Sequence, residues 1–161
     1  SDVYKRQLLD IGAYPGGWSQ VSSKIISTGK ILSLDIKKMD QLKNVSFILC
    51  DFLEGDTKAK ILKFFKNKLD VVISDMAANT TGNKSLDCIR TNQLCADVVK
   101  FSSKILKPNG VLVSKLFMGD DFLEVKELAK SMFKKVEFFK PESSRNESKE
   151  TYLHCEIIKS L

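Results

Sequence analysis

The chain has 161 residues, of which 43% are hydrophobic and 29% charged, with a formal net charge of +6 at pH 7. This length is typical of one domain with its own core, and the hydrophobic content excludes global disorder. The apolar runs, such as Leu69–Ile73, are far shorter than the roughly 20 residues of a membrane-spanning helix, and no amino-terminal targeting segment is visible. We therefore expect a soluble, cytoplasmic protein without a membrane partner.

Short β-like runs alternate with longer helical stretches along the chain, which predicts an α/β domain with a mainly parallel sheet. The predicted strands are Gln7–Ile11, Ile31–Leu34, Ser46–Leu49, Leu69–Ser74, Gly110–Phe117, Lys135–Phe139 and Thr151–Ile157. The predicted helices are Trp18–Ser27, Thr57–Lys66, Asp87–Leu106 and Phe122–Phe133. The last two strands follow each other without a helix between them, so we expect an antiparallel hairpin at one end of a seven-stranded sheet.

The first six residues are polar and lead almost directly into the first strand. We interpret residues 1–6 as unmatched or foreign to the natural protein, or as the remnant of a longer upstream segment. Residues 7–161 then form a single domain, because no repeat, low-complexity tract or linker interrupts them.

Several glycines stand where the first predicted strand turns into a helix, in the segment LLDIGAYPGGW of residues 8–18. Glycine lets the backbone approach a ligand that a side chain would block, which favours a cofactor loop. The segment has neither the GxGxxG spacing of a dinucleotide site nor the GK[ST] ending of a P-loop. The alternative is an ordinary tight turn between strand and helix.

Acidic residues follow the next two predicted strands. Asp35 ends the second strand, about twenty residues after the glycine loop, where a carboxylate can accept hydrogen bonds from both hydroxyls of a ribose. Asp51 follows the third strand, where it can accept from an adenine amino group. Either aspartate alone could be a helix cap or a solvated turn, but together with the loop they indicate an adenosyl ligand.

A second group of charged residues lies on the later strands. Asp75 closes the fourth predicted strand, Lys115 lies within the apolar fifth strand, and Glu150 precedes the last one. A lysine in an apolar strand needs a partner, and a Lys115–Asp75 pair could be tuned for proton handling. The alternatives are a lysine that reaches solvent from the strand end and a solvated loop around Glu150.

The cysteines and the histidine indicate neither a metal site nor a nucleophilic triad. Cys50, Cys88, Cys95 and Cys155 form no CxxC pair, and His154 is the single histidine. We expect buried thiols in a reducing compartment, a packed or surface histidine rather than a catalytic one, and no bound metal.

The positive charge is carried mostly by lysine, which contacts phosphate as a point charge and lacks the planar fork that reads bases. The charge favours a polyanion only weakly, because lysine-rich surfaces are common. The candidates for phosphate contact are Lys37, Lys38, Lys84, Arg90, Arg145 and Lys149. For each of them the alternative is a solvated surface charge.

The ordered segments LLDIGAYPGGWSQ, LSLDIKKMD, FILCDFLE, DVVISDMAAN, LKPNGVLVSKLFMG and KPESSRNESKETYLH closely resemble the FtsJ/RrmJ (RlmE) family of ribosomal RNA large-subunit 2′-O-ribose methyltransferases. The resemblance runs from Leu8 to about Glu156. It implies a Rossmann-like methyltransferase fold that binds S-adenosyl-L-methionine (SAM), with helices on both faces of the sheet. The SAM-binding residues that it implies are Gly12, Pro15, Gly16, Gly17, Trp18, Asp35, Ile36, Asp51, Phe52 and Asp75.

The family uses a Lys-Asp-Lys-Glu tetrad, of which the resemblance assigns Asp75, Lys115 and Glu150 as catalytic. The first lysine belongs, in the family, to a basic segment upstream of the first strand and has no counterpart here, so we expect the family's amino-terminal segment to be missing. The implied partner is large-subunit ribosomal RNA within the assembled large ribosomal subunit, and we expect a monomer that acts in ribosome biogenesis. An inactive RNA-binding fragment and a SAM-dependent methyltransferase for another substrate remain alternatives.

Overall fold

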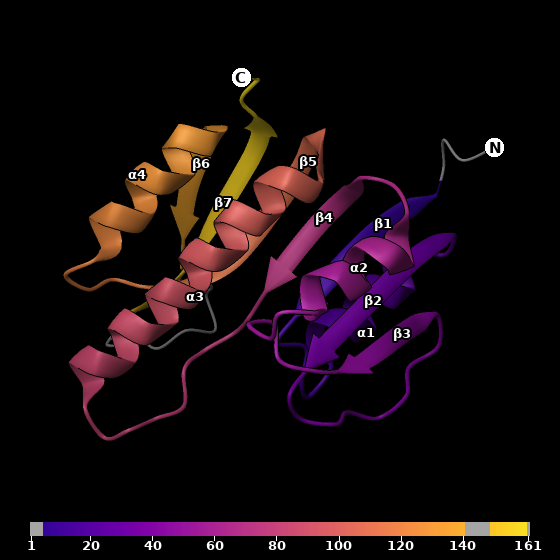
Figure 1. Ribbon diagram of the computed structural model, residues 1–161, viewed down its shortest axis with the longest axis horizontal. Coiled ribbons are helices and arrows are strands. Elements are labelled where there is room, and N and C mark those ends of the chain that lie inside the picture. The colour runs from indigo at the N-terminus through magenta and orange to yellow at the C-terminus, as the bar shows by residue number, and fades with distance from the viewer. Residues whose placement is uncertain (1–4, 141–148, 161) are drawn as a thin grey trace.

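A computed structural model describes residues 5–140 and 149–160 as a seven-stranded sheet with helices on both faces (Figure 1). The spatial strand order is β3-β2-β1-β4-β5-β7-β6. The strands are β1 Arg6–Ile11, β2 Gly29–Asp35, β3 Val45–Leu49, β4 Leu69–Ser74, β5 Leu106–Phe117, β6 Phe133–Phe139 and β7 Glu150–Ile158. The helices are α1 Gly17–Ile25, α2 Thr57–Phe65, α3 Lys84–Ile105 and α4 Phe122–Met132. In this part of the chain, no helix has the length and apolar character needed to span a bilayer.

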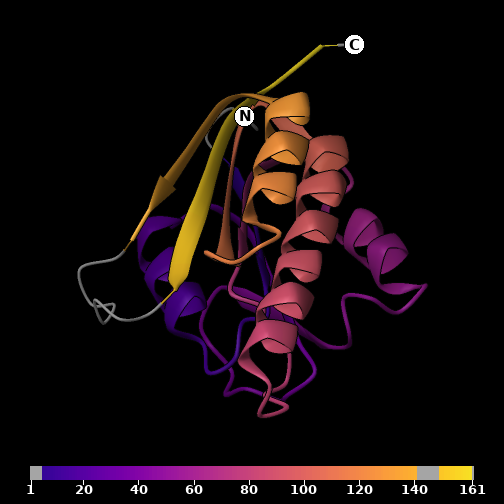
Figure 2. The ribbon, with the colours of Figure 1, turned by 90° about the vertical axis from the view of Figure 1, so that its left-hand side faces the viewer.

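The helices cover the two faces of the sheet unequally. Figure 2 shows α1 on one face, while α2, α3 and α4 lie on the other. The face under α3 and α4 carries the alternating buried residues of β5, such as Leu112 and Leu116. Lys115 lies between these two residues in the strand and therefore points to the opposite face.

Strands β3, β2, β1, β4 and β5 are mutually parallel, and β7 runs antiparallel to both of its neighbours, β5 and β6. The predicted antiparallel pair is confirmed, and β7 lies inside the sheet while β6 forms the edge. The strand order reverses between β1 and β4, the position at which open α/β sheets commonly bind ligands beyond the carboxyl ends of their strands.

Most element boundaries lie within two residues of the sequence prediction, and two differ by three or more residues. Helix α3 begins at Lys84 instead of Asp87 because the Asn83 side chain accepts a hydrogen bond from the Leu86 N–H (3.1 Å) and caps the helix there. Strand β5 begins at Leu106 instead of Gly110, since Leu106 pairs with Leu69 before an irregularity shifts the register.

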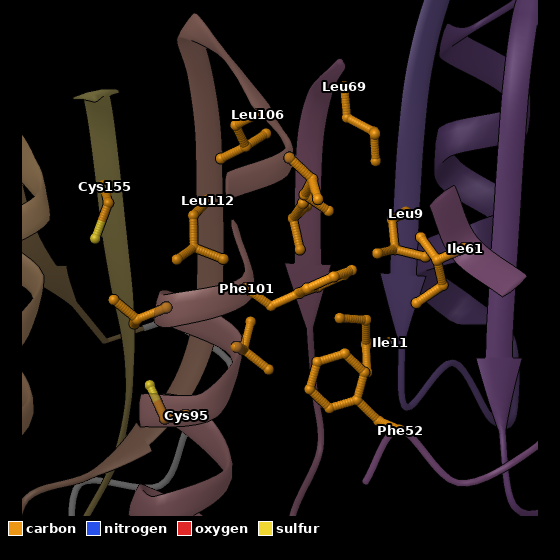
Figure 3. Close-up of a cluster of buried hydrophobic side chains, with 14 of the residues drawn as sticks. Leu9, Ile11, Phe52, Ile61, Leu69, Cys95, Phe101, Leu106, Leu112 and Cys155 are labelled. Atoms are coloured by element: carbon orange, nitrogen blue, oxygen red, sulfur yellow. The ribbon is translucent and has the colours of Figure 1, made fainter. Parts of the chain in front are cut away.

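The main core lies between the sheet and the helices α2, α3 and α4 (Figure 3). Phe101 of α3 packs edge-on against Phe52, with ring centroids 5.6 Å apart, beside Ile11 of β1. This packing joins α3 to the segment after β3. It thus holds both elements in place at the carboxyl ends of the parallel strands.

We predict that Leu112→Ala lowers the free energy of unfolding by about 2–5 kcal/mol, because the fully buried side chain leaves a cavity in the central strand β5. Urea denaturation would measure the change. The matched control is Leu62→Ala on the exposed side of α2, for which we expect a change within about 0.5 kcal/mol. Equal effects of the two substitutions would contradict this description of the core.

Candidate active site

A pocket of about 580 Å³ lies beyond the carboxyl ends of the parallel strands. Its wall includes residues that follow β1, β2, β3 and β4, together with one side of α3. The volume falls within the range of about 300–1,000 Å³ that is typical of small-molecule sites. Of the predicted SAM-binding residues, the pocket is lined by Gly12, Asp35, Ile36, Asp51, Phe52 and Asp75.

The turn after β1 brings the backbone against the neighbouring strands. The N–H groups of Gly12 and Ala13 donate to the carbonyl oxygen of Leu34, at 2.9 and 3.1 Å. Gly12 has a φ of +71°, and a Cβ atom at this position would lie 2.8 Å from Cγ of Met76. A residue other than glycine would therefore strain the turn and push β1 away from the segment after β4.

Asp35 is held by the backbone on both of its oxygens. The N–H of Tyr14 donates to Oδ2 and the N–H of Lys37 donates to Oδ1, each at 2.9 Å. A carboxylate has about four lone-pair sites, so each oxygen can accept one further hydrogen bond. The orientation suits a ligand that offers two hydroxyl donors.

Asp51 and Phe52 form the next part of the wall. Asp51 Oδ1 accepts from the N–H of Leu53 at 2.9 Å, while Oδ2 accepts no hydrogen bond from the residues that the structure describes. Phe52 is buried against Phe101 and offers the pocket an apolar surface beside this carboxylate. A flat aromatic ligand with an exocyclic amino group fits these two side chains.

The remaining predicted SAM-binding residues, Pro15, Gly16, Gly17 and Trp18, stand next to the pocket in sequence but do not line it. Gly16 has a φ of +115° and caps α1, which starts at Gly17. The ring of Trp18 contacts Tyr152, with centroids 6.0 Å apart. Their role in cofactor binding stays a prediction.

A buried polar network, which the sequence did not reveal, lies beside the turn after β1. Asp10 is fully buried, and its Oδ2 accepts a hydrogen bond of 2.6 Å from the Ser19 hydroxyl, which also lies 2.6 Å from the Ser33 hydroxyl. Oδ1 has no hydrogen-bond partner among the described residues. Burial raises the pKa of Asp10 from 3.8 to about 6, against the opposing effect of the Ser19 hydrogen bond.

Asp75, Lys115 and Glu150 come together at the ends of three adjacent strands, as predicted. The Lys115 Nζ lies 3.2 Å from Asp75 Oδ1 and 3.7 Å from Glu150 Oε2, and all three side chains are largely shielded from solvent. Asp75 also lines the pocket, so the lysine amine lies one residue beyond the wall of the pocket. The arrangement places an amine that contacts two carboxylates beside the wall of the pocket.

Tyr152 belongs to this cluster, although the sequence analysis did not single it out. Its hydroxyl donates to Asp75 Oδ1 at 2.8 Å. Burial raises the pKa of the Tyr152 phenol far above its ordinary value of 10, and the hydrogen bond to Asp75 and the charges of Asp75 and Glu150 add to the rise. Tyr152 therefore stays protonated and orients the carboxylate.

Two polar sets on α3 were not predicted as parts of the pocket or its support, although Arg90 was a candidate for phosphate contact. Arg90, Gln93 and Asp97 line the pocket from one helix face, and their spacing of three and four residues was the available signal. The buried Asn92 lies on another side of the helix, where its Nδ2 donates to the carbonyl of Phe117 (2.9 Å) and its Oδ1 accepts the N–H of the same residue (2.8 Å). Asn92 thereby fixes the end of the strand that carries Lys115.

The phosphate candidates are spread along this edge of the sheet. Lys37 and Arg90 line the pocket, and Lys38, Lys84 and Lys149 are exposed. Arg145 lies outside the residues that the structure describes.

Three of the cysteines are buried, and His154 does not line the pocket. Burial raises the pKa of both the Cys95 and the Cys155 thiol to about 12, so neither forms a thiolate near neutral pH. His154 Nε2 lies 3.1 Å from Glu156 Oε1 on the sheet face. Cys50, which lines the pocket, is also buried, and burial raises its pKa.

The family model of the FtsJ-like methyltransferases matches residues 2–157 of this chain. Two curated relatives carry the name Ribosomal RNA large subunit methyltransferase E. The protein of Pelagibacter ubique is 44% identical over 152 residues, which cover 94% of this chain and 75% of the relative. The protein of Rickettsia peacockii is 43% identical over 153 residues, which cover 91% of this chain and 67% of the relative.

Solved structures show the same architecture. A protein from Plasmodium falciparum, described as a ribosomal RNA methyltransferase, superposes with a TM-score of 0.81 at 29% identity, over 96% of this chain and 88% of its own. Human Methyltransferase-like protein 13, solved in complex with SAH, has a TM-score of 0.69 at 18% identity, over 95% of this chain and 72% of its own. The second likeness concerns the fold alone.

We predict that Asp10→Asn stabilises the protein near neutral pH. Because Asp10 binds its proton more tightly in the folded chain, its contribution to stability falls as pH rises from 3.8 to about 6. An asparagine keeps an acceptor for Ser19 without the buried charge. The expected gain in unfolding free energy is about 1–3 kcal/mol near pH 7.5 and shrinks towards pH 4.

Urea denaturation at several pH values would measure this gain. Asp40→Asn, at an exposed carboxylate, is the control and should leave the pH dependence of stability unchanged. A gain for Asp10→Asn that is equally large at acidic and neutral pH would contradict the assigned cause.

Proposed function

The chain belongs to the FtsJ-like methyltransferase family, and from this premise we propose that it transfers a methyl group from SAM to a ribose 2′-hydroxyl of large-subunit ribosomal RNA. The observation that carries the proposal is the Lys115 amine, held by two carboxylates next to the pocket. The names of the curated relatives support ribosomal RNA as the substrate. A uridine is the acceptor that we favour.

The pocket residues fit the parts of SAM. Asp35 keeps one acceptor site on each oxygen for the two ribose hydroxyls, and Asp51 Oδ2 can accept from the adenine amino group. Phe52 and Ile36 offer apolar surface for the adenine ring, while Gly12 leaves room at the turn. In this proposal, Asp75, which lines the pocket and contacts Lys115, lies near the methionine part.

SAM supplies an electrophilic methyl group on a positively charged sulfur. In our proposal, the ribose 2′-oxygen attacks this methyl group, the bond between the methyl group and sulfur breaks to release S-adenosylhomocysteine, and Lys115 Nζ, as the neutral amine, accepts the hydroxyl proton. Asp75 Oδ1, 3.2 Å from the amine, orients the lysine and the acceptor hydroxyl, and Glu150 Oε2 restrains the amine from the other side. Much of the acceleration then comes from positioning, because the donor is already activated.

Tyr152 has a positioning role in this scheme. Its phenol stays protonated and donates to the oxygen of Asp75 that also contacts Lys115. The hydrogen bond limits the rotation of the carboxylate, so the lysine amine keeps one position relative to the pocket. Tyr152 itself is not a candidate for the general base.

We also propose that the enzyme works as a monomer in the cytoplasm during ribosome biogenesis, on ribosomal RNA within the assembled large subunit. The net charge of +6 and the exposed lysines at the pocket edge support a polyanionic partner. Incubation with large ribosomal subunits and labelled SAM tests the function. Mass spectrometry of the digested RNA should find the label on a 2′-O-methylated nucleoside, and a label on a base would contradict the proposal.

We predict that Lys115→Ala lowers the rate of methyl transfer by about 10²–10⁴-fold, because the acceptor hydroxyl loses its base. The affinity for SAM should stay close to that of the wild type, since Lys115 does not line the pocket. Isothermal titration and a radiolabelled methyl assay would measure the two quantities. Lys63→Ala, at an exposed lysine of α2, is the control, and full activity of Lys115→Ala would exclude the assigned role.

We predict that Asp35→Asn weakens SAM binding by about 10–100-fold, since an amide replaces one of the two oxygens that accept from both backbone and ligand. The same substitution should leave the transfer rate at saturating SAM less affected. A titration with SAM gives the affinity. Unchanged affinity would show that the adenosyl ribose is not bound at Asp35.

A further inference from the structure

A row of aromatic side chains crosses the sheet face beside the catalytic cluster; the proposed reaction uses the Tyr152 hydroxyl but gives Phe139 no role. Across the β5–β7 pair, Lys115 lies opposite Tyr152, and across the β6–β7 pair Tyr152 lies opposite Phe139. Directly opposed residues of antiparallel strands point to the same face of a sheet. Lys115, Tyr152 and Phe139 therefore occupy one row on three adjacent strands.

The rings of this row are in contact, and its outer members face solvent. Phe139 stacks on Tyr152 with centroids 5.6 Å apart and an interplanar angle of 20°, and Trp18 contacts Tyr152 from α1. Tyr152 is 6% exposed, whereas Phe139 is 42% and Trp18 36% exposed. Phe139 and Trp18 therefore offer ring surface to a partner, while Tyr152 connects them to the catalytic cluster.

We infer that the row is a stacking surface for a base of the RNA substrate, with Phe139 as the principal contact; this inference rests on the proposed function. Aromatic side chains commonly bind the unstacked bases of single-stranded RNA. The surface continues into the catalytic cluster, because the Tyr152 hydroxyl donates to Asp75 (2.8 Å) and Asp75 contacts Lys115.

Distance and charge support a nucleic acid as the occupant. Two strand spacings separate Phe139 from Lys115, which amounts to about 10 Å. Stacked nucleotides rise by about 3.4 Å each, so the base lies within a few nucleotides of the methylated ribose. Lys140 follows Phe139 in the sequence, and Lys149 lies three residues before Tyr152. Both lysines are exposed and add positive charge for the phosphates.

The test measures base stacking separately from methyl transfer. The probe is a short oligouridylate with one central 2-aminopurine, whose fluorescence falls when the base stacks, and its match carries an abasic ribose at that position. Both are titrated onto the full chain with saturating S-adenosylhomocysteine. For the wild type we expect quenching and tighter binding of the 2-aminopurine probe.

Phe139→Ala should remove the quenching and raise the Kd for the 2-aminopurine probe by about tenfold, with little change for the abasic probe. Phe139→Tyr should restore both, which separates stacking from a loss of structure. Leu62→Ala, at an exposed residue of α2, is the matched control and should behave as the wild type.

Three results would overturn the inference: no quenching by the wild type, an unchanged Kd for Phe139→Ala, or an equal loss of affinity for both probes. The first is also the result expected if the row serves a protein contact. Methyl transfer by the wild type is assayed in parallel. Stacking without transfer to ribose would contradict the proposed function alone, and transfer without stacking would contradict this inference alone.

Discussion

One oxygen of Asp75 joins the reactive parts of the molecule. Asp75 Oδ1 lies 3.2 Å from the Lys115 amine and accepts the Tyr152 hydroxyl at 2.8 Å, so a single atom connects β4, β5 and β7. The same residue lines the pocket. Asp75 therefore links the pocket wall to Lys115 and Tyr152, and the Asn92 hydrogen bonds hold the end of the strand that carries Lys115.

Most of the fold could be predicted from the sequence, because the local spacing of apolar residues marks each strand and helix. The start of α3 was missed, since the Asn83 cap depends on a side-chain hydrogen bond rather than on periodicity. The position of β7 between β5 and β6 is a matter of long-range pairing. A sequence with two consecutive strands does not show which of the two pairs with β5.

The candidate site could be predicted where a charged residue lies at the end of a predicted strand. Asp35, Asp51 and Asp75 follow parallel strands, and such ends must meet at one edge of the sheet. The Lys115–Asp75 pair could be inferred from the lysine's apolar setting, whereas the grouping of Glu150 with this pair came from the family resemblance. Burial of a polar group is not visible in a sequence, which is why the network around Asp10 went unpredicted.

The direction of β7 affects when the enzyme becomes competent during its synthesis. Because β7 is antiparallel, its first residue, Glu150, arrives at the edge where the parallel strands end, and β7 also brings Tyr152. In the described part of the chain, β6 pairs with β7 alone, so the edge strand has no partner until β7 leaves the ribosome. A nascent chain can form the pocket and present Lys115 before β7 emerges, but it gains Glu150 and Tyr152, which contact Lys115 and Asp75, only with β7.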